Sequence, residues 1–199
     1  MPFVGIMLNK GVPAQLMAAT GMILFFVFSL MLSHSTLTTG ISDFFWPLAI
    51  RGLGLALLFV PLTTLAIGSL KGHEIGQGTG LNNMMRQLGG SFGIAGLTTL
   101  IHIRQAVHRN NLLSYINPYN PLYTERFNSY MQAFQAKGKS FSDATRMALG
   151  AINNAVDRQS SLLTYNDAYW VVGVVMLCAI PLVFLAPFKK GQKAITDSH

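Results

Sequence analysis

The sequence is poor in charged residues and almost free of cysteine. Only 11% of its 199 residues are charged, whereas an average soluble domain carries roughly 25%, so an ordinary water-soluble surface is not expected. The single cysteine, Cys178, rules out an intrachain disulfide and a cysteine-based zinc cluster. Because it lies inside an apolar run, Cys178 is predicted to be a small buried hydrophobic residue.

Acidic residues are fewer than basic residues. Seven Asp and Glu stand against fourteen Lys and Arg, which gives a net charge of +7. The basic residues are spread between apolar runs and do not form one patch, so membrane topology explains them better than nucleic-acid binding does. No Asp or Glu lies deep within any apolar run. Proton-driven transport usually needs a titratable group in the membrane, and this chain alone does not supply one.

Signatures of catalysis and of metal binding are also missing. His73-Glu74 lacks a second histidine four residues on, so it is not a zinc-protease motif. His102 and His108 are six residues apart, and no acid completes a ligand set nearby. We therefore predict no catalytic residue, no metal ligand and no cofactor, and we do not expect an enzyme.

Long apolar runs are what the sequence has in abundance, with 51% hydrophobic residues. Each run is near or above the roughly 20 residues that cross a ~30 Å hydrocarbon core as a helix. In lipid, a helix satisfies all its backbone hydrogen bonds internally, so these runs are predicted to be helical. The predicted spans are residues 14–33, 46–70, 78–101 and 168–188. The sequence thus indicates an all-α membrane protein with four transmembrane helices in the lipid bilayer.

The N-terminal apolar run is too short to be a span. Residues 1–8 are apolar, but eight residues cover only about 12 Å of helix. The positive charge of Lys10 follows this run instead of preceding it, which is unlike a secretory signal. We therefore predict that residues 1–8 are the remnant of a further, partial transmembrane helix.

The charges of the short loops predict the orientation. Lys10, Lys71 and the tail 189–199, which holds three lysines, fall on one side of a four-span arrangement. The opposite loop, residues 34–45, has no Lys or Arg. Because positively charged loops face the cytoplasm, the chain is predicted to be multi-pass with a cytoplasmic C-terminus.

The large segment between the third and fourth spans, residues 102–166, falls on the outer side. Its apolar residues recur at three- and four-residue spacing in two stretches, which are separated by Lys-Gly-Lys at residues 137–139. Ser140, with Asp143 three residues later, resembles a helix N-cap. An extramembrane helical hairpin is predicted, whose apolar faces pack on each other, on the membrane helices or on a partner protein.

The third predicted span carries a set of polar side chains one to two turns inside its cytoplasmic end, which we call the polar stripe. Residues four apart share a helix face, so these side chains can line one side of the span. One interpretation is a gate or a water-filled path, since ionisable groups within the membrane are functional candidates. The other is an arginine that extends to the cytoplasmic surface beside amides that hold helices together. The stripe consists of Asn82, Asn83, Arg86 and Gln87.

Glycines and a proline predict close packing and bending of two spans. Small residues four apart let another helix approach closely, and a proline within a helix frees a carbonyl group and bends the chain. Such bends suit proteins that alternate between two shapes, although Gly and Pro are common in membrane helices generally. The predicted packing and kink residues are Gly89, Gly90 and Gly93 in the third span and Gly52, Gly54 and Pro61 in the second, together with Arg51 at the start of that glycine-rich stretch.

Residues 51–96 closely resemble the C-terminal region of the fourteen-helix drug/proton antiporters of the major facilitator superfamily; their sequence is RGLGLALLFVPLTTLAIGSLKGHEIGQGTGLNNMMRQLGGSFGIAG. Asn83, Arg86, Gly89 and Gly90 match the Asn-x-x-Arg-x-x-Gly-Gly core of that family. The resemblance implies an exporter that uses protons to move hydrophobic small molecules out across a bacterial inner membrane. For Gram-negative members it also implies a periplasmic adaptor protein and an outer-membrane channel as partners.

The resemblance covers only part of such a transporter. That family needs fourteen spans, whereas four and a part of a fifth are predicted here. The chain is therefore expected to be a fragment of a major facilitator fold that depends on a missing N-terminal half and is not active alone. The alternative hypothesis is a non-transporting membrane scaffold whose outer hairpin binds a partner protein.

Overall fold

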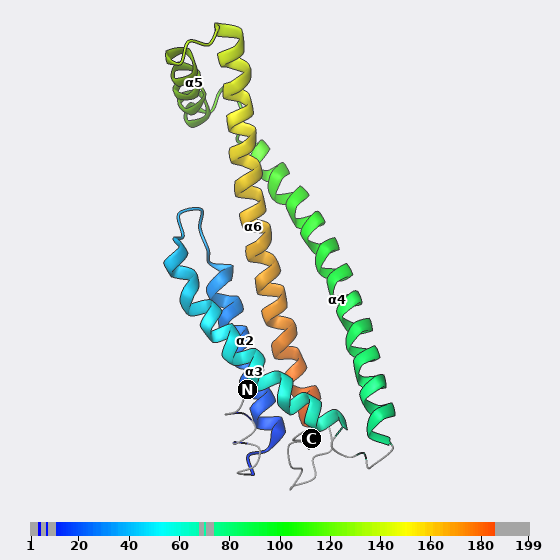
Figure 1. Ribbon diagram of the computed structural model, residues 1–199. Helices are drawn as coiled ribbons and strands as arrows, with labels where there is room; N and C mark the ends of the chain where they lie inside the picture. Colours follow the sequence, from blue (N-terminus) through cyan, green and yellow to red (C-terminus); the bar gives the residue numbers. More distant parts are fainter. Residues whose placement is uncertain (1–3, 5–6, 8–10, 68–69, 71–73, 186–199) are drawn as a thin grey trace. The chain divides into compact units, whose positions relative to one another are not determined.

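The computed structural model describes residues 4, 7, 11–67, 70 and 74–185, and helices make up most of these ranges (Figure 1). No strand occurs among the described residues. The helices are Ala14–Ser33 (α2), Ile41–Phe44 (η1, a 3-10 helix), Phe45–Ile67 (α3), Glu74–Leu113 (α4), Pro121–Ala136 (α5) and Phe141–Leu185 (α6). The predicted all-α class is confirmed for this part of the chain.

The chain divides into two compact units. The first unit comprises residues 1–97 and 168–199, and the second unit comprises residues 98–167. The helices α4 and α6 each contribute residues to both units. In contrast, α2, η1 and α3 belong wholly to the first unit, and α5 belongs wholly to the second.

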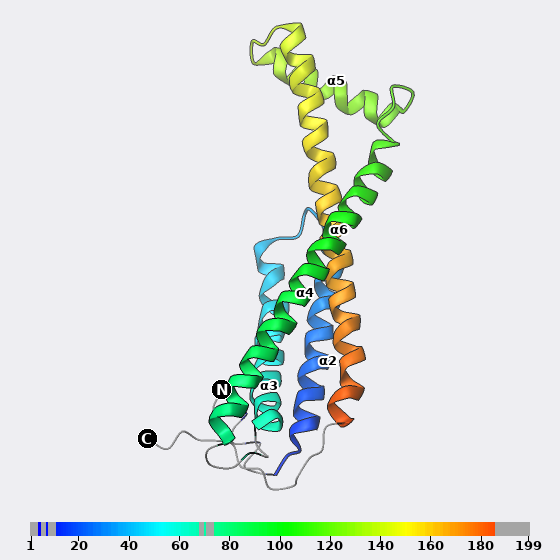
Figure 2. The ribbon, with the colours of Figure 1, turned by 90° about the vertical axis from the view of Figure 1, so that its right-hand side faces the viewer.

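Two glycines set the distance between α2 and α3, which lie side by side and run in opposite directions (Figure 1, Figure 2). A Cβ atom on Gly21 would lie 2.8 Å from the backbone oxygen of Gly54 and 2.9 Å from Cγ of Leu58. A Cβ atom on Gly54 would lie 3.1 Å from the backbone oxygen of Gly21. These separations leave no room for a methyl group, so the two backbones touch at this crossing, as small residues allow in membrane helices.

The core of the first unit lies where α2, α3 and α6 meet. Gly173 of α6 allows close contact with α2, because a Cβ atom there would lie 3.0 Å from side-chain atoms of both Phe26 and Ser29. In lipid, such packing stabilises the fold through van der Waals contact, since the surrounding lipid tails are as apolar as the side chains. The buried cluster that joins the three helices is Ala18, Met22, Leu58 and Val183.

The helix α3 continues through Pro61 to Ile67. Proline has no N–H group, so a backbone carbonyl one turn earlier lacks its helical partner. Pro61 is fully buried, and hydroxyl groups just after it bond back to the helix. Thr63 donates to the carbonyl oxygen of Phe59 at 2.7 Å, and Thr64 donates to that of Val60 at 2.9 Å. The helix thus continues on both sides of the proline, with two threonine hydroxyl groups bonded to its backbone.

Three of the described helices are long and apolar enough to cross a membrane. They are α2, α3 together with η1 before it, and α6, which correspond to the first, second and fourth predicted spans. Residues 78–101, the third predicted span, are helical within α4, but α4 is not among these three helices. The polar stripe and several glycines lower its hydropathy. Its crossing of the membrane therefore stays a prediction.

The helices α4 and α6 both extend into the predicted outer segment, residues 102–166. The helix α4 continues past residue 101 to Leu113, and α6 runs without a break from Phe141 to Leu185. The composition becomes more polar past the predicted end of a span, but the backbone hydrogen bonds of a helix can continue from turn to turn regardless of the side chains. The outer segment therefore consists largely of extensions of α4 and α6, with α5 between them.

Some predictions lie outside the described residues. These are the cytoplasmic tail, residues 189–199, and most of the apolar run 1–8. The charges at Lys10 and Lys71, on which the predicted orientation depends, lie outside them too. The orientation in the membrane therefore stays a prediction.

Cys178 is exposed, and the prediction that it is buried is wrong. Cys178 lies three residues after Val175 and four before Leu182, and Leu185 follows three residues later; these three apolar side chains are exposed as well. Together they form one apolar face of the helix. Such a face suits contact with lipid, where a thiol behaves as a small hydrophobic group and needs no protein neighbour.

The second unit contains a helical hairpin formed by α5 and the start of α6. Asn120 caps α5, because its Oδ1 atom accepts a hydrogen bond from the N–H of Leu122 at 3.1 Å. The chain turns after α5 at Gly138, whose φ of 78° is a conformation that glycine adopts without strain. At the start of α6, Oγ of Ser140 accepts a hydrogen bond from the N–H of Asp143 at 3.2 Å, the contact expected of an N-cap.

A side-chain contact joins the two helices of this hairpin. Ala144 and Ala148 near the start of α6 are completely buried. The hydroxyl group of Thr145 lies 3.9 Å from Sδ of Met131 in α5. The structure thus shows one contact within the hairpin, and the partner on which its apolar faces pack stays a prediction.

Candidate functional site

Arg86 of the polar stripe extends from α4 to a side chain of α3. Its Cζ atom lies 5.3 Å from the ring centroid of Phe59, within the range of a cation–π interaction. Its Nη2 atom donates a hydrogen bond to Oδ1 of Asn83 at 3.0 Å. Within the part of the chain that the structure describes, no carboxylate lies within ion-pair distance of this guanidinium group. The group is held by an aromatic ring and an amide alone.

The hydrogen bond within the polar stripe joins residues three apart, and the other members differ in exposure. Arg86 bonds to Asn83, three residues earlier, and so the amide of Asn82 is not the one that holds it. Asn82 is half-buried, whereas Gln87 is exposed. Phe59 was not indicated by any sequence pattern, because one aromatic residue in an apolar run looks like any other packing residue.

The glycines of α4 form a face without a neighbour. Cβ atoms built on Gly89, Gly90 and Gly93 meet no atom within 4 Å outside their own helix backbone. No residue of α4 is buried, and Phe92 is 77% exposed. We call Gly89, Gly90 and Gly93 the glycine face. The close helix contact that these residues predict is not made by any other described helix.

Arg51 belongs to an aromatic cluster in the first unit that joins α2, α3 and α6. Its Cζ atom lies 5.8 Å from the ring centroid of Phe28. The same ring makes edge-to-face contacts with Phe25 at 5.3 Å and with Tyr169 at 6.0 Å. An exposed cation–π contact contributes about 0.5–1 kcal/mol, so Arg51 helps to hold the helices together. Gly52 beside it has no atom within 4 Å of a built Cβ and makes no close helix contact.

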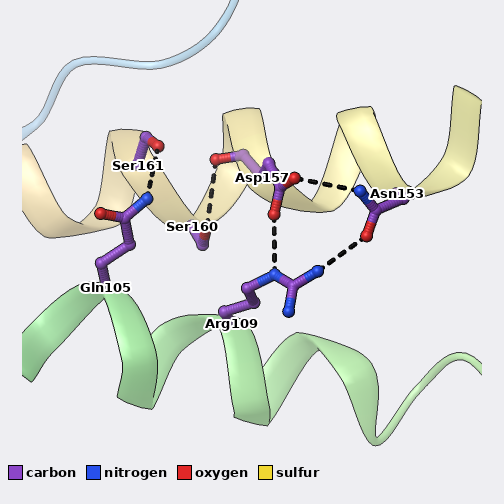
Figure 3. Close-up of polar contacts among 6 residues, drawn as sticks. All are labelled: Gln105, Arg109, Asn153, Asp157, Ser160 and Ser161. Carbon is purple, nitrogen blue, oxygen red and sulfur yellow. Dashed lines mark hydrogen bonds and ion pairs between the residues drawn. The ribbon is translucent and has the colours of Figure 1, made fainter. Parts of the chain in front are cut away.

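Polar side chains of α4 and α6 meet within the second unit (Figure 3). Arg109 donates from Nε to Oδ1 of Asp157 at 2.8 Å and from Nη2 to Oδ1 of Asn153 at 2.7 Å. One turn earlier on α4, Nε2 of Gln105 donates to Oγ of Ser161 at 3.4 Å. A guanidinium group that bonds through two nitrogens fixes orientation as well as distance. These contacts therefore set how the two helices pair.

A histidine extends the same set of contacts. The Nε2 atom of His108 lies 2.7 Å from Oδ2 of Asp167, and Nε of Arg104 lies 3.6 Å from that same oxygen. No sequence pattern pointed to these pairs, because the partners are separated by 59 residues in the case of His108. The four-residue spacing of Arg104 and His108 was the available signal, but it required a helix that continues beyond residue 101. No group of three or more His, Cys, Asp or Glu in the described ranges could hold a metal ion.

The helices and the site define an all-helical membrane protein whose helices meet at glycines and whose polar stripe centres on a guanidinium group. Comparison with known proteins identifies its relatives. The chain is 31% identical over 153 residues to the fatty acid resistance protein FarB of Neisseria gonorrhoeae, a match that covers 76% of this chain and 29% of the relative.

Two further relatives extend this finding. The multidrug export protein EmrB of Escherichia coli strain K12 is 29% identical over 148 residues, which cover 73% of this chain and 27% of the relative. The uncharacterized MFS-type transporter YhcA of Bacillus subtilis strain 168 is 24% identical over 193 residues, which cover 96% of this chain and 36% of the relative. No family model matches the chain, and no solved structure matches it.

The chain is a distant homologue of part of the multidrug efflux transporters of the major facilitator superfamily, and the family resemblance predicted from residues 51–96 is confirmed. It spans 29% and 27% of the length of the first two relatives. The names of these relatives describe export and resistance proteins, so what the chain resembles is a transporter.

Proposed function

We propose that the chain forms part of a proton-driven multidrug exporter, which moves hydrophobic compounds out across the inner membrane of a bacterium. The observation that carries the proposal is the match to a fatty acid resistance protein, which covers 76% of the chain at 31% identity. A second relative is a multidrug export protein. Three helices that are long and apolar enough to cross a membrane support the proposal.

The polar stripe is the proposed lining of the substrate path or of its gate. A guanidinium group within a membrane helix is costly unless it faces protein or a water-filled cavity. Arg86 has N–H donors beyond the one that bonds to Asn83, and the ring of Phe59 offers apolar surface beside it. A charge next to an aromatic ring supports contact with compounds that have both a polar and an apolar part.

The proposed transporter requires further helices beside α4. The glycine face meets no other helix in the described chain, yet small residues at this spacing allow close contact between membrane helices. The relatives are longer, since the chain spans less than a third of FarB and of EmrB. We infer that the helices that complete the transporter pack on the glycine face and that the chain does not transport alone.

The proposed arrangement in the membrane follows from the loop charges. We take residues 78–101 as a fourth span. The polar stripe would then lie within the membrane, where it lines the proposed substrate path and does not face lipid. With Lys10 and Lys71 in the cytoplasm, residues 98–167 lie on the outer side. The proposed partners there are a periplasmic adaptor protein and an outer-membrane channel.

A chimera tests this proposal. The chain replaces the matching segment of the E. coli export protein in a strain that lacks that protein, and growth is measured against hydrophobic antibiotics. The chimera is expected to restore resistance, Arg86→Ala to abolish it and Arg86→Lys to reduce it. Arg158→Ala, which changes the same residue type at an exposed position outside the stripe, is expected to leave resistance unchanged.

The amount of chimera in the membrane decides how the result is read. A chimera that is present at the normal amount and restores no resistance contradicts the proposal. If the chimera does not accumulate, the chain is expressed as a separate polypeptide beside the unmatched part of the relative, and growth is measured again.

A membrane scaffold whose outer hairpin binds a partner protein is the second candidate function. The observation in its favour is the exposure of Tyr119 and Phe141 in the second unit, which are 92% and 67% exposed. The burial of Ala144 and Ala148 supports packing within the hairpin instead. The scaffold function predicts that Arg86→Ala has no effect, whereas Tyr119→Ser weakens capture of the partner.

A further inference from the structure

Two contacts that join α4 to α6 in the second unit differ in their chemistry. In one, the ionic groups are Arg109 and Asp157, residue types that ordinarily stay charged between pH 5 and 8. In the other, His108 meets Asp167, and histidine is the side-chain type that gains and loses a proton in that range. One contact is therefore built from permanent charges and the other from a charge that depends on pH.

The geometry of the second contact suits reversible protonation. Nε2 of His108 lies 2.7 Å from Oδ2 of Asp167, and the two side chains are 21% and 35% exposed. The pair is thus partly covered by protein, yet water can still reach it and exchange protons with it. Arg104 also faces the pair, with its Nε atom 3.6 Å from the same oxygen, and Arg109, the residue after His108, forms an ion pair with Asp157.

We propose that His108 and Asp167 form a proton-binding site, which holds α4 and α6 together more tightly when His108 carries the proton. With a neutral imidazole, Nε2 can donate a hydrogen bond to the carboxylate. With a protonated imidazole, the same contact becomes an ion pair between opposite full charges. Arg104 lies farther from the same oxygen, at 3.6 Å compared with 2.7 Å for His108, and its charge offsets part of this attraction.

The role of this site in transport rests on the proposed function. In an exporter driven by protons from the outer side, a site in the second unit is reached by protons before they enter the membrane. Proton uptake would tighten the packing of α4 on α6, and proton loss would loosen it.

Distance measurement on the full chain in lipid nanodiscs tests the site directly. Cys178 is replaced by alanine, and spin labels are attached at Ile103 on α4 and Tyr165 on α6, which are 58% and 54% exposed. Double electron–electron resonance then gives the ratio of short to long label distances at pH 5.5 and pH 8.5. This ratio is expected to be about two- to fivefold higher at pH 5.5, the range for a partly exposed ion pair.

Three variants separate the site from general effects of acid. His108→Gln keeps a donor at the contact but cannot carry the charge, so the pH response is expected to vanish. Asp167→Asn removes the anion and leaves His108 in place, with the same expected loss. Arg109→Gln weakens the neighbouring contact and is expected to lengthen the distances at both pH values while the two- to fivefold response remains.

Either of two results overturns the site. One is a labelled parent chain whose distances do not change with pH. The other is a full response that persists in His108→Gln or Asp167→Asn, with helix content confirmed by circular dichroism. Because the distances are measured without transport, such a failure leaves the exporter proposal standing. A chimera that restores no resistance, in turn, leaves the proton-binding site standing.

Discussion

An alanine at position 54 would place its Cβ atom 3.1 Å from the backbone oxygen of Gly21 and 3.3 Å from the backbone nitrogen of Phe25. Both neighbours are backbone atoms, which cannot rotate away as a flexible side chain could. The helices α2 and α3 must therefore separate, and the contacts on either side of the crossing weaken. Overpacking of this kind costs about 1–3 kcal/mol, while the better helix propensity of alanine returns up to about 1 kcal/mol.

The net loss for Gly54→Ala is therefore expected to be about 0.5–2 kcal/mol. Gly21→Ala is expected to lie at the upper end, because its Cβ atom would approach the oxygen of Gly54 to 2.8 Å. Gly52→Ala is the matched control: it makes the same change two residues away on α3, where a Cβ atom meets nothing within 4 Å. Its stability is expected to be unchanged or slightly higher.

The assay is reversible unfolding of the full chain in mixed micelles, followed by circular dichroism as the proportion of sodium dodecyl sulfate rises. The free energy of unfolding is compared between each variant and the unmodified chain. If Gly54→Ala is as stable as Gly52→Ala, the close crossing of α2 and α3 does not exist as described, and the reasoning from it fails.

Three other predictions concern the stripe, the glycine face and the hairpin. Gly93→Leu meets open space, so it is expected to leave the isolated chain within about 0.5 kcal/mol of its normal stability but to abolish growth of the chimera strain on antibiotic; normal growth would rule out packing on the glycine face. Phe59→Leu removes the ring that faces Arg86 and is expected to slow dye efflux by about two- to fivefold, the equivalent of one exposed cation–π contact, at an unchanged amount in the membrane. The hydrogen bond from Ser140 holds the pKa of Asp143 below its ordinary value of 3.8, so the stabilisation is complete above that value and is lost as the pH falls through the lower folded value. Asp143→Asn is therefore expected to reduce the acid sensitivity of helix content between pH 6 and 2, and an unchanged acid profile would contradict this.

Sequence patterns were sufficient where one helix could be read on its own. The uncharged run 14–33 predicted a span at the position of α2, and the structure begins and ends that helix at the same residues. Lys-Gly-Lys at residues 137–139 predicted a break, and α5 ends just before it at Ala136. In both places the local signals, which are apolar length in one case and a turn with glycine in the other, agree with the final packing.

Contacts between helices could not be read in this way. Gly54 was a candidate for close packing, but its partner Gly21 was not, since a single glycine in an apolar run gives no sign of what it faces. The same holds for Phe59 beside Arg86. His108 lies in the predicted outer segment and Asp167 directly after it, and only the continuous helices α4 and α6 bring them together. Which residues of two helices face each other depends on how the helices are aligned in space, and the periodicity of one helix does not give that alignment.

The central claim is that the chain is part of a proton-driven exporter in which Arg86 faces the substrate path. Substrate accumulation in inverted membrane vesicles that contain the chimera tests it most directly, with an imposed proton gradient as the only energy source. We expect accumulation that a protonophore abolishes, that Arg86→Ala abolishes and that Arg158→Ala preserves. Vesicles that hold the normal amount of chimera and accumulate no more substrate than empty vesicles would contradict the claim.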